Sequence, residues 1–198
     1  MLVIEAPNEL DDIYEYNKEL EKNGLSQISR TGQDLIKCFL AGGITGTKNW
    51  QQEVIKHLQN DYSLKDTKCL IIYNPRRSNF DVNKKDESRK QIEWEAKYLT
   101  DCDILSFYFA GGESLQPITL YEFGRYPLVK RDQNRSWRYP IIKQTLVSIE
   151  DGYKREEDVI CQNRIGCNVS IYQHSNPALH SQLIYNAYQY ALKTSTSR

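Results

Sequence analysis

The sequence predicts an α/β fold in which a doubly wound parallel sheet carries helices on both faces, built as a single domain over residues 1–198. Short apolar runs alternate with segments whose apolar residues recur at helical spacing, and strands that alternate with helices form βαβ units. The run at 102–109 is apolar at most positions, as expected of a strand covered on both faces. The chain length also falls within the usual range of one domain, roughly 100–200 residues.

Apolar runs and helical spacing define the elements of the first half of the chain. KCFLAG (37–42) is a short apolar run that glycines end, which is typical of a strand. TKNWQQEVIKHLQN (47–60) carries its apolar residues at helical spacing. CLIIYNP (69–75) is again strand-like and ends at a proline, and the N-terminal LVIEAP (2–7) is expected to add an edge strand.

The second half begins with an expected helix at 86–101, which Asp86 can cap, and with the strand at 102–109. SLQPITLYEFGRYP (114–127) predicts a short helix at 117–126, because two prolines bound a largely apolar stretch of helical length. The remaining expected elements are strands at 144–150 and 167–173 and a final helix at 176–193.

Composition and charge argue against several classes of protein. Lys and Arg together number 26, as do Asp and Glu, and this balance argues against a dedicated nucleic-acid-binding protein. No apolar run approaches the roughly 18 residues needed to span a bilayer, and the N-terminal segment lacks the pattern of a secretory signal. The five cysteines and three histidines lack metal-ligand spacing. We therefore expect a cytoplasmic protein with no metal, no cofactor and no membrane partner.

Three of the expected strands are followed by small, polar or charged loops. The sequences are AGGITGTKNW (41–50), NPRRSNFD (74–81) and AGGESLQPIT (110–119). Because ligands of such sheets bind at the carboxyl ends of the strands, we expect these loops to lie side by side and to form a site. The glycine-rich loop lacks the spacing of a dinucleotide fingerprint or of a P-loop, so on its own it is equally consistent with a tight strand-to-helix turn.

Two glutamates are predicted to lie on apolar faces of the two helices that flank the strand at 102–109. By helical spacing, Glu95 shares a face that consists of Ile92, Ala96 and Leu99. Glu122 is placed beside a second set, which consists of Ile118, Tyr121 and Arg125. Burying an ionised carboxylate is costly unless it is paired or functional, so these two positions need an explanation.

The two acids admit two interpretations. One is structural: an ion pair, for example of Glu122 with Arg76, Arg77 or Arg125, or a glutamate at the edge of the apolar stripe that reaches solvent. The other is catalytic, because a carboxylate nucleophile with an acid/base partner is the arrangement of retaining glycosyl chemistry, which passes through an oxocarbenium-like transition state. The position of both acids beside one strand end favours the catalytic interpretation.

Five sequence motifs point to a known family. In order they are FLAGGITGTKNWQ, YNPRRSNFD, QIEWEAKYLTDCDILSFYF, QPITLYEFG and IEDGYKREEDVICQ. Over most of residues 2–185 the chain resembles the nucleoside 2-deoxyribosyltransferase-like proteins, and it is least like them at 8–36 and 129–143. The resemblance implies a flavodoxin-like, Rossmann-like fold and a homo-oligomer. It also implies cleavage of the N-glycosidic bond of a deoxynucleoside or nucleotide, with transfer of the sugar to a free base or to water.

The resemblance assigns roles to three residues. Glu122 matches the family's nucleophilic glutamate, which precedes a hydrophobic residue and a glycine. Glu95 stands where the transferases carry an aspartate that handles the proton of the base, eight residues before Asp103. Gln116 stands where the transferases have an acid, and their hydrolase relatives a serine, that contacts the sugar hydroxyls.

The resemblance also implies a substrate pocket. Gly43 and Ile44 match the loop that lines the base, and Thr119 belongs to the same substrate-binding set. The candidates for contacts to the base or to a phosphate are Asn74, Arg76, Arg77 and Asp81. The arginines could instead hold the acids in place. Three functions therefore remain open: transfer to a second base, hydrolysis of a nucleoside or nucleotide, and sensing of a nucleotide without catalysis.

Overall fold

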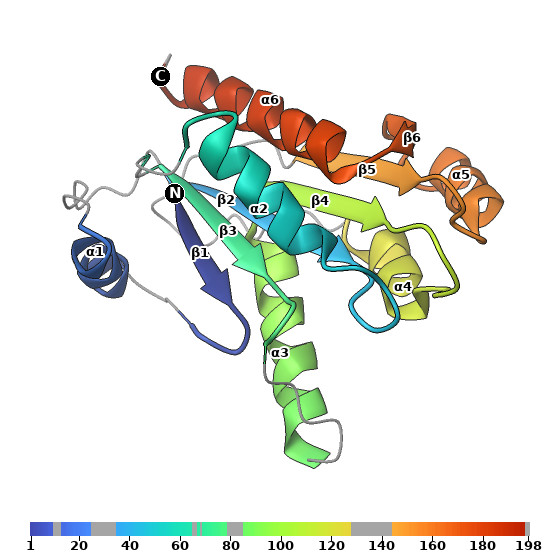
Figure 1. Cartoon of the computed structure of the whole chain (residues 1–198), viewed down its shortest axis with the longest axis horizontal. Coiled ribbons are helices and arrows are strands. Elements are labelled where there is room, and N and C mark those ends of the chain that lie inside the picture. The colour runs from blue at the N-terminus through green and yellow to red at the C-terminus, as the bar shows by residue number, and fades with distance from the viewer. Residues whose placement is uncertain are drawn as a thin grey trace.

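The computed structural model describes residues 1–9, 13–24, 35–64, 67, 69–78, 85–127 and 144–196. Within this part of the chain, six parallel strands form one sheet with helices on both faces, which confirms the predicted α/β fold (Figure 1). The strands are β1 (Leu2–Glu5), β2 (Ile36–Gly42), β3 (Leu70–Asn74), β4 (Ile104–Phe109), β5 (Gln144–Glu150) and β6 (Ile171–Ser175). The N-terminal strand lies at an edge, as the sequence predicts.

The order of the strands is β1-β3-β2-β4-β5-β6. When β1 is set aside, the remaining strands have the flavodoxin-like order 2-1-3-4-5. In that order the chain first winds from β2 to β3 and then continues on the other side of β2 with β4. The strands β3, β2 and β4 are therefore neighbours, and the point where the winding reverses, at which such folds bind ligands, lies beside β2.

The helices form two layers (Figure 1). They are α1 (Ile13–Lys22), α2 (Trp50–Asn60), α3 (Lys85–Asp101), α4 (Pro117–Arg125), α5 (Glu156–Ile165) and α6 (Pro177–Thr196). Side chains of α2 and α6 pack on one face of the sheet, and side chains of α1, α3, α4 and α5 pack on the other. Both helices that carry the predicted catalytic acids, α3 and α4, therefore lie on the same face.

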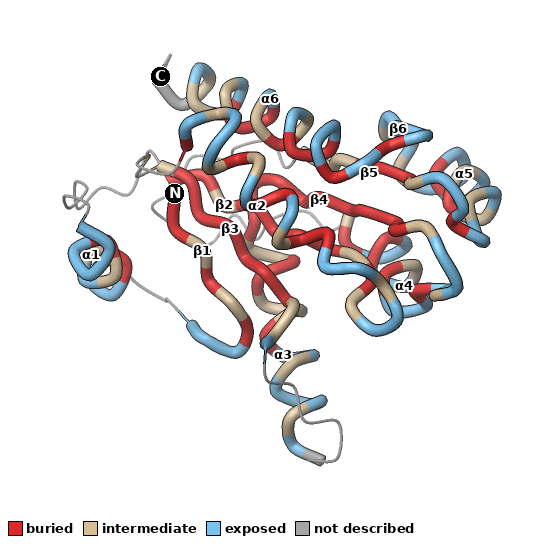
Figure 2. Tube along the Cα trace, viewed as in Figure 1, coloured by how far each residue is buried: buried red, intermediate tan, exposed pale blue. Residues whose placement is uncertain are grey.

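The central strands are buried on both sides, as Figure 2 shows by their red colour. In β4, Phe107 and Phe109 face the layer that contains α3 and α4, whereas Ile104 and Tyr108 face α2 and α6. Alternate side chains of a strand point to opposite faces, so an apolar run fills both halves of the core at once. This arrangement explains why these strands read as continuous apolar runs in the sequence.

The structure corrects the predicted elements in two respects. The helices α1 and α5 were not predicted, and the last strand begins at Ile171 rather than at residue 167. The late start has a local cause, because the side chain of Asn163 donates to the carbonyl of Val169 and accepts from its N–H. These bonds hold the segment after α5 as a turn, so its backbone cannot join the sheet before Ile171.

Candidate functional site

The three loops that the sequence predicts to lie together do so over their described residues, 41–50, 74–78 and 110–119, because β3, β2 and β4 are adjacent. Two side chains link the loop after β2 to the loop after β4. The hydroxyl of Ser114 donates to the carbonyl of Thr45 at 3.1 Å, and the side chain of Gln116 accepts from the N–H of Gly43 at 3.0 Å. The candidate site thus lies at the carboxyl edge of the central strands.

Gln116 is held between two loops. Its Oε1 accepts from Gly43, its Nε2 donates to the carbonyl of Ala110 at 2.7 Å, and only 4% of the residue is exposed. It caps the start of α4 in the left-handed conformation, with φ of 47°. A Cβ at position 43 would lie 2.7 Å from the Gln116 side chain, so the close approach of the loops requires a glycine there. Both ends of the amide that was predicted to contact the sugar therefore bind main-chain atoms.

Arg76 clamps the loop after β2. Its guanidinium donates to the carbonyl of Ile44 at 2.9 Å, to the carbonyl of Lys48 at 3.0 Å and to the hydroxyl of Thr47 at 2.8 Å. Its Nε donates to Gln51 at 2.9 Å. Every one of these partners is a neutral oxygen, so Arg76 orders the predicted base-lining loop and does not hold either of the two acids.

The other predicted polar residues lie around this clamp. Arg77 forms an ion pair with Glu87 of α3, a different acid from the predicted catalytic pair. Asn74 is buried, and its side-chain oxygen accepts from the N–H of Arg76 at 3.1 Å. Asp81, which was also predicted to contact substrate, lies outside the described residues.

Glu122 is buried on the inner side of α4, with 8% of the residue exposed. Its buried neighbours on the helix are Thr119 and Phe123, whereas the predicted neighbours Ile118 and Tyr121 are 64% and 62% exposed. That part of the prediction was wrong. The packing of aromatic side chains determines which side of α4 faces the sheet. Phe123 packs edge-on against two phenylalanines of β4, namely Phe107 and Phe109.

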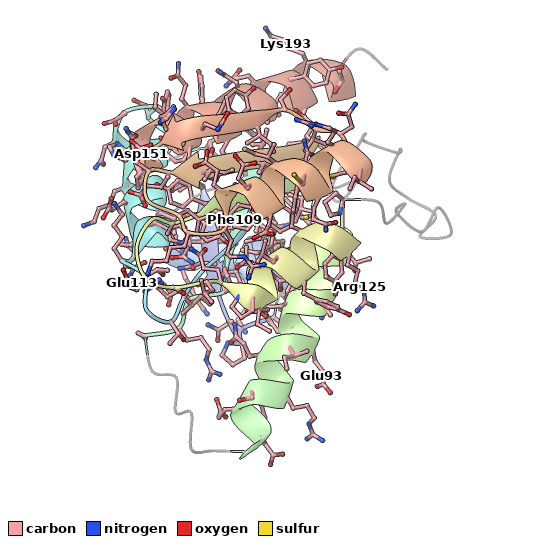
Figure 3. The ribbon with its side chains drawn as sticks, turned by 90° about the vertical axis from the view of Figure 1, so that its right-hand side faces the viewer. Glu93, Phe109, Glu113, Arg125, Asp151 and Lys193 are labelled. Carbon is pink, nitrogen blue, oxygen red and sulfur yellow. The ribbon has the colours of Figure 1, made fainter. Side chains whose placement is uncertain are left out.

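Glu95 lies at the edge of the buried face of α3. That face consists of Trp94, Tyr98 and Leu99, whereas the predicted neighbour Ile92 is 64% exposed, which corrects the predicted stripe. Glu93 is exposed and points outward from α3 (Figure 3). The side chain of Gln91 donates to Oε1 of Glu95 at 2.7 Å. Glu95 is thus partly buried and anchored by a neutral amide.

The pKa values of both acids are raised. Burial raises the pKa of Glu122 to about 8, and the nearby charge of Glu95 adds to this shift. Burial also raises the pKa of Glu95, against the opposing effect of the Gln91 hydrogen bond. Across the described part of the chain, no ion pair involves either acid. The ion-pair interpretation of Glu122 therefore finds no partner in Arg76, Arg77 or Arg125.

Tyr126, which was not among the predicted site residues, completes this group of side chains. It is buried at the end of α4, one turn after Glu122, and its N–H donates to the Glu122 carbonyl at 2.9 Å. Burial is the main cause of its raised pKa, and the charges of Glu122 and Glu95 raise it further although Arg125 opposes them. The i, i+4 spacing from Glu122 is the signal by which the sequence could have identified it.

The chemistry of the site follows from two sets of residues. The helices α3 and α4 supply the acidic pair, Glu95 and Glu122, together with Tyr126 and Thr119. The loops at the sheet edge supply Gly43, Ile44 and Gln116.

Within the described ranges, no three His, Cys, Asp or Glu side chains gather in a way that could hold a metal ion. The helices in the same ranges include none with the length and hydropathy to cross a membrane.

Comparison with known proteins adds one finding. The model of a family described as nucleoside 2-deoxyribosyltransferase like matches residues 36–137, just over half of the chain. The matched segment runs from β2 through α4 and contains both acids and all of the loops described above. A search of curated proteins finds no match.

Proposed function

Because the chain belongs to the nucleoside 2-deoxyribosyltransferase-like family, we propose that it cleaves the N-glycosidic bond of deoxynucleosides and transfers the sugar to another base. One observation carries this proposal. Two carboxylates from different helices lie close together at the carboxyl edge of the central strands, and within the described residues no cation neutralises them. Buried acids with perturbed pKa values at such a position are typical of catalytic sites.

In the proposed reaction, Glu122 attacks the anomeric carbon of the sugar. A glycosyl-enzyme ester forms, the C–N bond breaks, and the base leaves with the electron pair of that bond. Glu95 donates a proton to the leaving base, and it later takes the proton of the incoming base as that base attacks the ester and frees Glu122. The transition state is oxocarbenium-like, so a neighbouring carboxylate stabilises the positive charge that develops on the sugar.

Of the two raised pKa values, only that of Glu95 suits this division of roles. Burial favours a protonated Glu95, which the first step requires as an acid. Glu122 must be ionised to attack, although burial and the charge of Glu95 raise its pKa to about 8. Positive charge develops on the sugar only in the transition state, and there it favours the ionised form of Glu122.

The proposed substrate contacts come from the loops and from α4. We propose that Gly43 and Ile44 line the base and that Thr119 contacts the sugar, which is supported by its burial on α4 one turn before Glu122. Asn74, Arg77 and Asp81 remain the proposed contacts to the base or to a phosphate. Arg76 and Gln116 act mainly through the loops that they hold, which is supported by their bonds to main-chain atoms.

We also propose that residues 1–198 form a single domain that assembles as a homo-oligomer in the cytoplasm. Exposed apolar side chains on and before α4, namely Leu115, Ile118 and Tyr121, support an interface between copies of the chain. All five cysteines are free, which is consistent with a reducing compartment. The proposed partners are a nucleoside or nucleotide and a free base.

The test is chromatographic and uses Glu122→Gln, which keeps the size of the side chain and removes its charge. Each common deoxynucleoside and its 5′-monophosphate is incubated with the protein, with and without a second base. We expect the wild-type protein to release free base, and the variant to lose activity on the order of several hundredfold or more. Glu93→Gln removes an exposed charge from α3 and serves as the control, with activity near that of the wild type.

The products distinguish the open alternatives. A new nucleoside that forms only when a second base is present identifies transfer, whereas free sugar identifies hydrolysis. Activity near the wild-type level in Glu122→Gln contradicts the nucleophilic role. If every substrate survives and one of them raises the melting temperature, the protein binds a nucleotide without turning it over.

A further inference from the structure

Gln91 links the two parts of the candidate site. It lies on α3 one turn before Glu95, and its Nε2 donates to Oε1 of Glu95 at 2.7 Å. The same nitrogen donates to the carbonyl of Pro75 at 2.8 Å, in the loop that follows β3. One amide group thus connects the carboxylate to the loop whose next residue, Arg76, clamps the loop after β2.

The orientation of this amide is determined by its surroundings. Its two N–H bonds face two oxygen acceptors, and the reverse orientation would place the amide oxygen against both of them. The observed orientation leaves Oε1 of Gln91 buried without a hydrogen-bond partner. A buried unsatisfied acceptor costs about 1–3 kcal/mol, and native structures tolerate few such groups. The fold bears this cost while it supplies a donor to Glu95.

From this geometry we propose that Gln91 is a positioning residue for Glu95. It holds Oε1 of the carboxylate and leaves Oε2 to exchange a proton with the base of the substrate. The inference rests on the proposed function, because it assigns the oxygen through which Glu95 would act. Gln91 itself touches no reacting atom.

The hydrogen bond also affects where the proton of the site resides. The ionisable groups of α4 near Glu95 are Glu122 and Tyr126, and the charge of Glu95 raises the pKa of both. The Gln91 donor opposes burial and stabilises the ionised form of Glu95. Its removal should therefore keep the proton on Glu95 to higher pH and hinder the step in which Glu95 is the base.

The central variant is Gln91→Met, which keeps the length and helix propensity of the side chain and removes its donor. It also removes the unpaired oxygen, so we expect it to fold. Gln182→Met makes the same exchange at an exposed position of α6 and controls for the chemistry of the substitution. Glu95→Gln, alone and combined with Gln91→Met, shows whether Gln91 acts through Glu95.

We expect Gln91→Met to lower kcat for transfer to a second base about 10- to 100-fold, the size of effect that misplacement of a catalytic group by about 1 Å produces. KM should change little, and the pH limb that belongs to Glu95 should move upward. In the Glu95→Gln background, Gln91→Met should have almost no further effect. Gln182→Met should match the wild type.

A titration separates this inference from the proposed function. Carboxyl NMR of glutamate-labelled protein, with signals assigned through Glu95→Gln and Glu122→Gln, should show Glu95 titrating at higher pH in Gln91→Met than in the wild type. This readout needs no turnover, so it tests the role of Gln91 even if the wild type cleaves no nucleoside. An unmoved Glu95 signal, or equal losses of activity in the presence and absence of Glu95, overturns the proposal.

Discussion

At the scale of single residues, the proposed function and the stability of the fold favour opposite protonation states of the Glu122 carboxyl group. The proposed attack on a sugar needs the ionised form, whereas burial and the charge of Glu95 favour the protonated form. The exposed carboxyl of an unfolded chain has a pKa near 4.5. The folded protein therefore retains, between pH 4.5 and about 8, a proton that the unfolded chain releases.

A stability measurement tests this difference. The folded-state pKa of Glu122 is raised, so its contribution to stability is fully present below pH 4.5 and is lost as the pH rises through about 8. The amide of the Glu122→Gln variant does not titrate, so only the wild type loses this stability as the pH rises. The free energy of unfolding of the variant minus that of the wild type should therefore increase from pH 5 to pH 9, by an amount on the order of a few kcal/mol. Urea denaturation at pH 5, 7 and 9 measures it.

The control for this prediction is Glu93→Gln, which removes an exposed carboxylate from α3. Its difference from the wild type should stay nearly constant over the same pH values. If Glu122→Gln behaves in the same way, Glu122 is ionised in the folded protein at neutral pH and the burial argument is wrong.

At the scale of loops and helices, Arg76 organises the segment between β2 and α2. Its planar guanidinium reaches several oxygens of residues 44–48 at once, and the Gly43 carbonyl also accepts from Trp50 at 3.0 Å. A lysine in its place offers one point of contact rather than a fork of donors. The loop therefore takes several of its hydrogen bonds from one side chain at the neighbouring strand end, beside those of Trp50, Ser114 and Gln116.

We expect Arg76→Lys to loosen the loop after β2 and to leave the rest of the sheet intact. Carbonyls that lose their donor are left unsatisfied, at a cost of about 1–3 kcal/mol for each one that stays buried. Hydrogen exchange should become faster over residues 43–51, and KM for the nucleoside should rise. Arg89→Lys, at an exposed position of α3, is the matched control. Unchanged exchange in the loop would contradict the clamp.

Helices α3 and α4 also show how far helical spacing can predict a site. The spacing identifies both acids as residues of packed helices, and both acids do face the protein interior at least in part. It misjudges their neighbours, because Ile92 and Ile118 are exposed. Large rings, such as Trp94 in α3 and Phe123 in α4, determine the rotation of each helix against the sheet, and a count of residues does not weigh ring size.

At the scale of the whole molecule, the outer side of α4 is apolar although its inner side carries the proposed nucleophile. Ile118 and Tyr121 are both more than half exposed, and Leu115 lies just before the helix. A second copy of the chain that covered this surface would bury apolar area close to the site. The proposed oligomer would then assemble through the helix that carries Glu122.

We expect Ile118→Lys to reduce the oligomer to smaller species, because a charge would be buried in the interface. Size-exclusion chromatography with light scattering measures the mass. Tyr190→Lys, which replaces an exposed aromatic residue of α6, should leave the mass unchanged. A monomeric wild type, or an Ile118→Lys protein of wild-type mass, contradicts an interface on α4.

The sequence by itself determined the α/β class, the loops at three strand ends and the positions of Glu95 and Glu122. These features depend on local patterns, since apolar periodicity and turn residues lie within one element and its boundary. Only the tertiary structure decided which partners the polar groups take. It places Arg76 on carbonyls of another loop and Gln91 between Glu95 and Pro75. Such contacts join distant parts of the chain, and packing of the core selects among the donors and acceptors that the sequence offers.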